Sequence, residues 1–275
     1  MIFRPTTSVQ RLTLILSILV LLTPWSPGLA QAGWLIAAAI TLPSASPAPP
    51  SSPSLMTVVS GNHIKYATRA WAQVVDLSTQ RILIINHISQ AYWEGPLDEY
   101  LLVIAEQTSN MRAALLKQLS PEQRVQIEKR SGPFDSLAPT LAITFERTDE
   151  EDTIAGYKAN KYIVLRNGEA YEETWIAKEI NFATEVDQQK FKALVKRQQE
   201  ARTTPPGVVL AELTELLGKG YPVKTVNVLS GVAKTVVQCE KKTIAESEFL
   251  APSHYTAKPL QEVTAPQPMP RKPGT

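Results

Sequence analysis

The chain has 275 residues, with 28 lysines and arginines against 26 aspartates and glutamates. Two of the basic residues, Arg4 and Arg11, lie in the N-terminal segment, so the rest of the chain carries equal numbers of basic and acidic residues. Balanced charge with interspersed signs gives no support for the clustered basic surface that nucleic acids require, and we expect no nucleic-acid partner.

The N-terminal segment is typical of a cleaved secretory signal peptide. Two arginines precede an apolar run over residues 12–22, and Ala30-Gln31-Ala32 forms a small-x-small exit. This order predicts a signal peptide at 1–32, cleavage near Ala32, and a location in the periplasm or outside the cell. A second apolar stretch at 34–42 is too short to span a bilayer. It either extends the targeting region or tethers the protein to the membrane as part of an uncleaved N-terminal segment.

Proline-rich segments bound the predicted folded domain. Residues 33–55 combine the second apolar stretch with a linker, because residues 43–54 contain five prolines and five serines. Such a composition favours an extended spacer. Residues 264–275 are also rich in proline and are expected to form a disordered tail. A single folded domain is therefore predicted at 56–263.

The first half of this domain shows short strands followed by helices. Runs rich in β-branched and aromatic residues predict strands at 62–68, 72–77, 81–87 and 91–93. Pro96 starts a helix whose first turn carries two carboxylates, which suit the positive end of the helix. Ser120-Pro121-Glu122-Gln123 has the spacing of a capping box and predicts a second, short helix.

The second half returns to strands. The pattern predicts strands at 140–147, 153–165 and 170–177, with Asn167-Gly168 as the hairpin turn between the last two. Helices follow at 185–202 and 208–217, and two final strands at 223–229 and 234–241 turn over at Ser230-Gly231. Antiparallel strands with a few helices predict an α+β fold, a curved, half-barrel-like antiparallel sheet with helices packed on its concave face.

One hairpin carries a resemblance to a known family. The strand Ile154-Ala155-Gly156-Tyr157 and the strand Trp175-Ile176-Ala177-Lys178 resemble those of a family of exported bacterial domains of unknown function, and weaker similarity extends over 57–256. Members of that family often have a cysteine where this chain has Ala159, so any role of that thiol is absent here. Gly156 inside a strand would also indicate a bulge or a close backbone approach. The hairpin itself is at least as well explained by a structural role as by binding.

A second, more distant resemblance concerns the order of strands and helices. It is similar to that of the half-barrels that carry lipoproteins across the bacterial periplasm, which hold an acyl chain between a curved sheet and covering helices. This likeness is one of fold, and fold does not determine function.

The sequence contains no local motif for catalysis or for a metal. The spacings of hydrolase, nucleotide-binding and zinc motifs are missing, and His63, His87 and His254 each stand alone. The acidic run at 149–152 is better explained as a solvated turn than as a cation site, since it lacks the EF-hand spacing. We therefore expect no metal, no cofactor and no catalysis. Cys239, the only cysteine, excludes an intramolecular disulfide; it is expected to be a small buried residue, with an intermolecular disulfide or a reactive thiol as the alternative.

Aromatic residues are the best candidates for a binding site. On a curved sheet under helices, they would line a cavity for a lipid or another apolar small molecule, or else they are ordinary core. The alternative function is a protein-interaction or structural envelope domain with a filled core and an envelope protein as its partner; an enzyme of undetected class is a third. The candidate ligand-binding residues are Tyr66, Trp71, Trp93, Tyr157 and Trp175.

Overall fold

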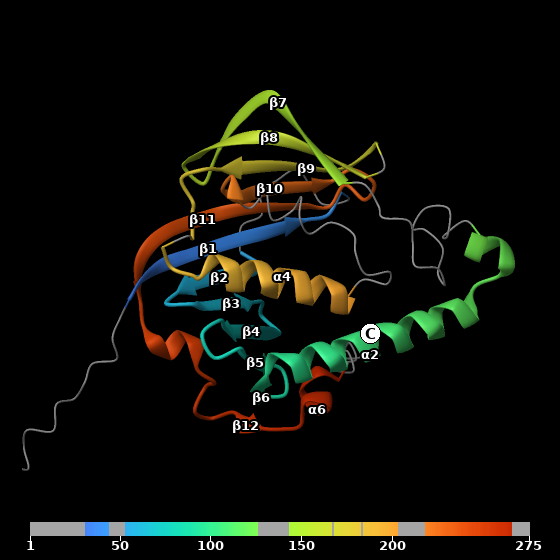
Figure 1. Ribbon diagram of the computed structural model, residues 1–275, viewed down its shortest axis with the longest axis vertical. Helices are drawn as coiled ribbons and strands as arrows, with labels where there is room; N and C mark the ends of the chain where they lie inside the picture. Colours follow the sequence, from blue (N-terminus) through green and yellow to red (C-terminus); the bar gives the residue numbers. More distant parts are fainter. Residues whose placement is uncertain are drawn as a thin grey trace, which may run out of the picture.

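The computed structural model describes residues 31–43, 53–125, 143–166, 168–182, 184–202 and 218–265. These residues form one sheet with the strand order β12-β6-β5-β4-β3-β2-β1-β11-β10-β9-β8-β7. The sheet is curved and open, and helices α2 and α4 cross one of its faces (Figure 1). The predicted α+β class with a curved antiparallel sheet is confirmed.

Neighbouring strands are antiparallel, except that β12 pairs with β6 in parallel. The strands are β1 (Gln31–Thr41), β2 (Leu55–Ser60), β3 (His63–Ala67), β4 (Trp71–Asp76), β5 (Arg81–Asn86), β6 (Ala91–Pro96), β7 (Ile143–Ile154), β8 (Tyr157–Arg166), β9 (Glu169–Ala177), β10 (Tyr221–Asn227), β11 (Ala233–Ile244) and β12 (Thr256–Ala257). The helices are α2 (Leu97–Gln118), α4 (Gln188–Arg202), α6 (Leu260–Thr264) and the 3-10 helix η1 (Glu246–Phe249).

Strands β2 to β6 form a meander of successive hairpins. The turn between β2 and β3 consists of Gly61 and Asn62, whose φ angles of 55° and 67° are those that a two-residue type I′ turn requires. Strands β4 and β5 are buried along their length except at their ends, because one face lies under the helices and the other under the C-terminal segment. Burial on both faces explains why their sequences are nearly continuous runs of apolar residues.

The second apolar stretch of the sequence forms β1, which lies in the middle of the sheet between β2 and β11. The expectation that residues 33–55 lie outside the folded domain is therefore wrong for 33–41, and the boundary predicted at residue 56 is too late. A strand covered on both faces shows no polar alternation, so its sequence looks like the short apolar core of a signal peptide. Most of the predicted linker, residues 1–30 and the tail from 266 lie outside the described residues.

The Ile-Ala-Gly-Tyr motif is a hairpin turn and not the interior of a strand. Strand β7 ends at Ile154, β8 begins at Tyr157, and the two are joined by Ala155 and Gly156 with φ angles of 52° and 85°. A Cβ at Gly156 would meet no heavy atom within 4 Å, so the expected close approach at this residue is wrong. The glycine instead supplies the positive φ of a type I′ turn.

The acidic run at 149–152 belongs to β7 and is not a turn between two strands. The pairing of β7 with β8 shifts between Arg147 and Glu151, so the run begins at an irregularity of the ladder, and its side chains are exposed. β7 is also the outermost strand of the sheet. Charged side chains on an edge strand discourage pairing with other chains, which explains this run without a ligand.

Helices α2 and α4 pack on the same face of the sheet. Leu97 and Leu101 of α2 and Leu194 of α4 are buried in one core cluster with residues of most strands. Met111 of α2 is 73% exposed, and the second half of this helix projects beyond the sheet (Figure 1). None of the described helices combines the length and the apolar character that crossing a bilayer would need. The predicted helix at 208–217 lies outside the described residues.

The short helix after α2 begins with the predicted capping box. The Ser120 N–H donates to Gln123 Oε1 at 2.9 Å, and the Gln123 N–H donates to Ser120 Oγ at 3.3 Å. Each side chain thus satisfies one backbone donor of the first turn.

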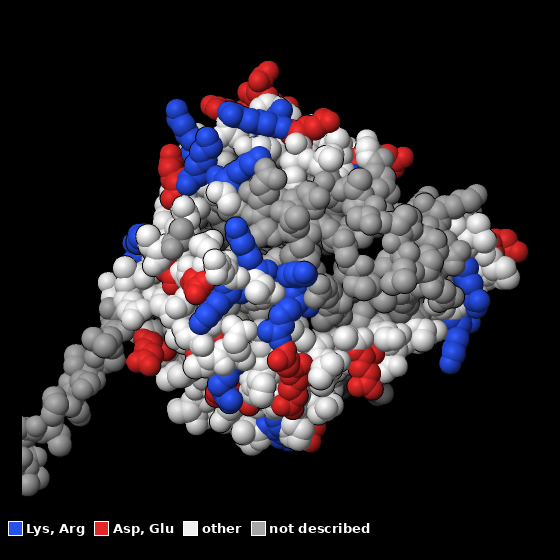
Figure 2. Space-filling model, viewed as in Figure 1, with Lys and Arg blue, Asp and Glu red and all other residues white. Residues whose placement is uncertain are grey.

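Charge complementarity joins the two long helices. Figure 2 shows lysine and arginine side chains gathered over α4, with acidic side chains near the start of α2 beside them. Arg197 of α4 forms an ion pair with Asp98 of α2 and also donates to Gln80 Oε1 at 3.3 Å. The ion pair orients α4 along the start of α2.

The C-terminal segment, residues 246–264, wraps around the β6 edge of the sheet, with η1 on the face opposite α2 and α4, and with α6 on the same face as those two helices. Phe249 of η1 is buried in a second core cluster, and Lys65 Nζ lies 2.9 Å from Glu248 Oε2. Backbone bonds from Thr256 N–H to the Gln90 carbonyl and a side-chain bond from Asn86 Nδ2 to the Val263 carbonyl continue the attachment. The last residues of the domain thus complete the core of its first hairpins.

Candidate functional site

The predicted ligand-binding residues differ in their surroundings. Tyr66, Trp93 and Tyr157 are half-buried against the helix-covered core, and Trp175 is buried within it, whereas Trp71 is 43% exposed at the start of β4. Trp93 lies on β6 and Trp175 on β9, with seven strands between them. These five residues therefore do not form a single site.

A more compact group lies at the middle of the helix-covered face, and we call it the central aromatic cluster. It includes the predicted Tyr66 and Tyr157, and it adds Trp34, Phe182 and Tyr221, which the sequence did not indicate. The Phe182 ring lies 6.3 Å from the ring of Trp34 and 5.3 Å from that of Tyr221. Residues far apart in sequence meet here because β1 lies beside β11, and β11 lies beside β10.

The tyrosines of the cluster lie close to other polar groups. The Tyr157 hydroxyl donates to the Cys239 carbonyl at 3.3 Å. The Tyr221 side chain lies near those of Thr57 and Tyr66. Burial raises the pKa of Tyr66, and burial together with neighbouring Tyr66 raises the pKa of Tyr221 well above its usual value. The three tyrosines are therefore neutral hydrogen-bonding groups in an environment that disfavours negative charge.

Cys239 lies at the edge of this cluster, and burial raises the pKa of its thiol to about 11. Since the thiolate is the nucleophile, we expect the folded protein to react slowly with 5,5′-dithiobis(2-nitrobenzoate) at pH 8. One thiol should react quickly after unfolding in urea. Rapid modification of the native protein would instead favour a reactive thiol and would contradict this account.

Trp175 lies between two lysines that pair with it across the sheet. Lys224 Nζ is 4.3 Å and Lys161 Nζ is 5.2 Å from the centre of its ring. Lys161 also binds Glu173 at 3.0 Å and Glu150 at 3.1 Å. The bond with Glu173 contributes most to raising the pKa of Lys161, and the bond with Glu150 adds to it. Cation–π contacts and ion pairs thus hold Trp175 as part of the framework.

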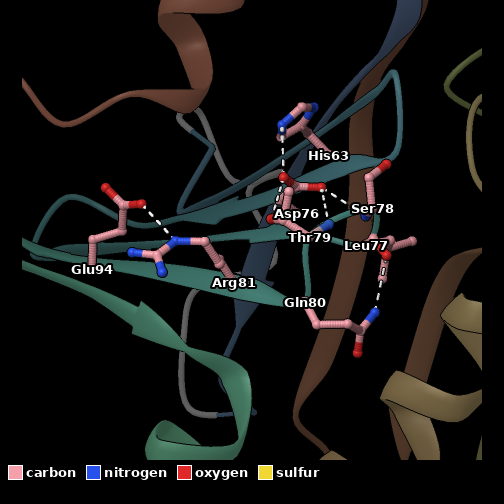
Figure 3. A network of polar contacts seen from close by, with 8 residues as sticks. All are labelled: His63, Asp76, Leu77, Ser78, Thr79, Gln80, Arg81 and Glu94. Carbon is pink, nitrogen blue, oxygen red and sulfur yellow. Dashed lines mark hydrogen bonds and ion pairs between the residues drawn. The ribbon is translucent and has the colours of Figure 1, made fainter.

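The opposite face has a small polar cleft beside the C-terminal segment. A cavity of about 190 Å³ is lined by His63, Asp76, Arg81, Glu94 and Phe249, among others. Figure 3 shows the His63 ring directed at Asp76, with Nε2 3.9 Å from Oδ2, and Arg81 paired with Glu94 at 3.1 Å. The charged groups of this cleft are thus paired with one another.

Asp76 organises the turn between β4 and β5. Its carboxylate accepts bonds from Ser78 N–H at 2.7 Å and from the Thr79 hydroxyl at 2.5 Å. Burial alone would raise the pKa of Asp76, but the bonds from Thr79 and Ser78 and the charge of His63 outweigh it and lower the pKa. The Asp76 carboxylate thus serves to hold the turn between β4 and β5 together.

We expect Asp76→Asn to destabilise the protein at pH 7 more than at pH 3. A carboxyl whose pKa is lower in the folded state stabilises the fold above its unfolded pKa of ~3.9, and this stabilisation is lost as the pH falls through the folded pKa. Urea unfolding at both pH values would measure the difference. Asp149→Asn, at an exposed residue of β7, is the control and should change little. An equal effect of Asp76→Asn at both pH values would contradict this expectation.

The three histidines all contact aromatic residues of the C-terminal segment. The His63 ring stacks on Phe249 at 4.9 Å, His87 Nδ1 is 3.0 Å from the Tyr255 hydroxyl, and His254 packs edge-on against Tyr255 at 4.7 Å. Burial, and then the charge of Lys65, lowers the pKa of His87. Among the described residues there is no group of three or more acidic, histidine or cysteine side chains that could hold a metal ion.

A family model described as "Domain of unknown function (DUF4412)" matches residues 125–255. This stretch contains β7 to β11 and η1, and it is shorter than the predicted span of 57–256. The match agrees with the resemblance to a family of unknown function, whereas the resemblance to lipoprotein carriers stays a prediction. No curated protein matches the chain.

Two solved structures have a distant likeness to this one. They are titled "Structure of PNGF-II in P21 space group" and "Structure of PNGF-II in C2 space group", and they are 9% and 10% identical to this chain over 83% and 85% of its length. Both have a TM-score of 0.36, and the match covers 31% and 32% of those chains. This chain thus spans about a third of the length of those proteins, and we draw no functional conclusion from so distant a likeness.

Proposed function

We propose that the protein is exported and binds a lipid or another apolar small molecule between its sheet and its two long helices. The central aromatic cluster carries this proposal. Tyr66, Tyr157 and Tyr221 keep part of their surface accessible, although burial raises the pKa of each hydroxyl. Side chains that are surrounded by protein and still accessible are typical of the lining of a ligand site.

The same groups support binding without catalysis. Nucleophilic catalysis needs a thiol or hydroxyl whose pKa is lowered or that has a base beside it. In this cluster the pKa values of Cys239 and of the tyrosines are raised. A panel of esterase, peptidase and glycosidase substrates is the test, and turnover that one point substitution abolishes would overturn this part of the proposal.

Export is supported by the signal-like N-terminal sequence. Because β1 begins at Gln31, cleavage near Ala32 would leave residues 33–41 in the sheet. N-terminal sequencing of protein from the envelope and the medium tests it. An intact Met1 in the membrane fraction would favour a tethered protein instead.

Native mass spectrometry of protein isolated from its own host tests the ligand. We expect a bound apolar molecule, and we expect the double substitution Tyr66→Leu and Tyr221→Leu to reduce its occupancy. Trp71→Leu, at an exposed aromatic residue of the same sheet, is the matched control and should keep the ligand. Protein that carries no apolar molecule and binds none when offered lipid extracts would contradict the proposal.

One observation favours the second candidate, a protein-interaction domain. Four aliphatic side chains at the end of β1 and in the turn between β10 and β11 are exposed, namely Ile40 (50%), Leu42 (56%), Val228 (47%) and Leu229 (84%). Exposed apolar groups that gather at one end of a sheet mark contact surfaces. Loss of a cross-linked envelope partner after Leu229→Asp, with Ile88→Asp in another hairpin turn as the control, would support this candidate.

A further inference from the structure

The indole N–H of Trp34 is a buried donor without an acceptor. Trp34 is 7% exposed, and its Nε1 is the single buried side-chain nitrogen or oxygen that lacks a hydrogen-bond partner within the part of the chain that the structure describes. An unsatisfied buried donor costs about 1–3 kcal/mol, so its retention at the centre of a sheet calls for a reason. Contact with the proposed ligand site would supply that reason, because a bound ligand can provide the missing acceptor for the indole N–H.

The donors near Trp34 converge on the same region of the helix-covered face. Trp34 contacts Phe182, and Phe182 contacts Tyr221, which lies beside Tyr66. The Tyr66 side chain is half-buried against the same core cluster. Neutral N–H and O–H groups thus stand next to an apolar surface formed by β1 to β3, an arrangement that suits a ligand with an apolar chain and a polar end.

The charges around the cluster decide what kind of polar end fits. Lys241 Nζ lies 5.7 Å from the centre of the indole ring, but it already binds the buried carboxylate of Glu185 at 2.8 Å. Burial would raise the pKa of Glu185, yet the bonds from Lys241 and Thr184 outweigh it and keep the carboxylate ionised. A ligand carboxylate would therefore bring a second negative charge to one lysine, whereas an uncharged carbonyl would not.

We propose that the ligand is an acyl ester or amide whose uncharged carbonyl accepts hydrogen bonds from Trp34 Nε1 and from the hydroxyl groups of Tyr66 and Tyr221. The acyl chain then lies along the apolar surface of β1 to β3. This inference rests on the proposed function, since it specifies the ligand of the same face.

Displacement of a neutral fluorescent probe, N-phenyl-1-naphthylamine, tests the inference on the purified exported protein. The competitors are methyl laurate, laurate and tridecane, which have similar chain lengths and carry a neutral carbonyl, a charged carboxylate and no acceptor, respectively. For the parent protein at pH 8 we expect laurate to be the weakest of the three. Trp34→Phe keeps an aromatic ring and removes the donor. We therefore expect it to weaken the binding of methyl laurate by about 3- to 10-fold, as loss of one hydrogen bond does, and to leave the binding of tridecane unchanged.

Trp71→Phe makes the same chemical change at an exposed indole and should alter none of the three affinities. Circular dichroism melts of both variants verify that they are folded before binding is compared. If Trp34→Phe weakens the binding of methyl laurate and of tridecane equally, or if laurate binds as tightly as the ester, then the ligand is not recognised through an uncharged carbonyl. The protein would still be one that binds apolar molecules. If neither the probe nor any competitor binds the parent, the proposed function itself fails, and this inference with it.

Discussion

Gly33→Ala is expected to lower the free energy of unfolding by about 3 kcal/mol, at the upper end of the range for overpacking. A Cβ at this residue would lie 2.4 Å from the Val59 carbonyl oxygen, 2.7 Å from Ser60 Cβ and 2.8 Å from Ile244 Cγ1. The first of these neighbours is backbone of β2 and cannot rotate away, so β1 would have to move within the sheet. Urea unfolding followed by far-ultraviolet circular dichroism measures the loss.

Gly218→Ala is the matched control for this experiment. A Cβ at Gly218 would meet no heavy atom within 4 Å, and the same methyl group should leave stability nearly unchanged. A Gly33→Ala protein as stable as the parent would mean that β1 does not lie as closely against β2 as its pairing of Trp34 with Val59 indicates.

Trp175→Ala should cost about 3–5 kcal/mol, as large-to-small substitutions in a core do. The ring is 7% exposed, lies in the core cluster, and supports Lys161 and Lys224 through its face. Its loss would leave a cavity and would also remove a contact from each of two cations. Thermal and urea unfolding measure the effect, with Trp71→Ala, at 43% exposure, as the control that should cost far less.

This result also separates two views of Trp175 itself. If the ring lines a ligand cavity, its removal should leave the unfolding free energy of the unliganded protein nearly unchanged and reduce ligand retention. If it is framework, stability falls whether or not ligand is present. A Trp175→Ala protein that is as stable as the parent and retains as much ligand would contradict both.

Local signals in the sequence predicted much of the fold. Strands β3 to β6 agree with runs of β-branched residues, the capping box at Ser120 has both of its bonds, and Gly168 has the positive φ that the predicted turn requires. The failures have a common physical cause. Central strand β1 is apolar on both faces and follows a signal-like run, so its sequence resembles a targeting segment. Gly156 lies in a two-residue turn, so the end of β7 and the start of β8 look like one continuous strand in the sequence.

The candidate site was harder to predict than the fold. Tyr66 and Tyr157 were among the predicted aromatic residues, but Trp34 was placed in an apolar stretch outside the predicted domain, and Phe182 and Tyr221 lie outside any motif. Their proximity depends on the pairing of β1 with β11, and no local pattern encodes a contact between residues so far apart in sequence. The orphan indole N–H is likewise a property of three-dimensional surroundings.

The place of β1 in the sheet has a consequence for how the chain acquires its structure. β1 is made together with its neighbour β2, but its other neighbour β11 is made about 200 residues later, since Gln31 pairs with Ile244. Contacts this distant along the chain slow folding. Until β11 arrives, β1 presents an apolar strand with one unpaired edge, which is prone to associate with other chains. The strand at the middle of the finished sheet is thus the one most in need of protection while the protein is being made.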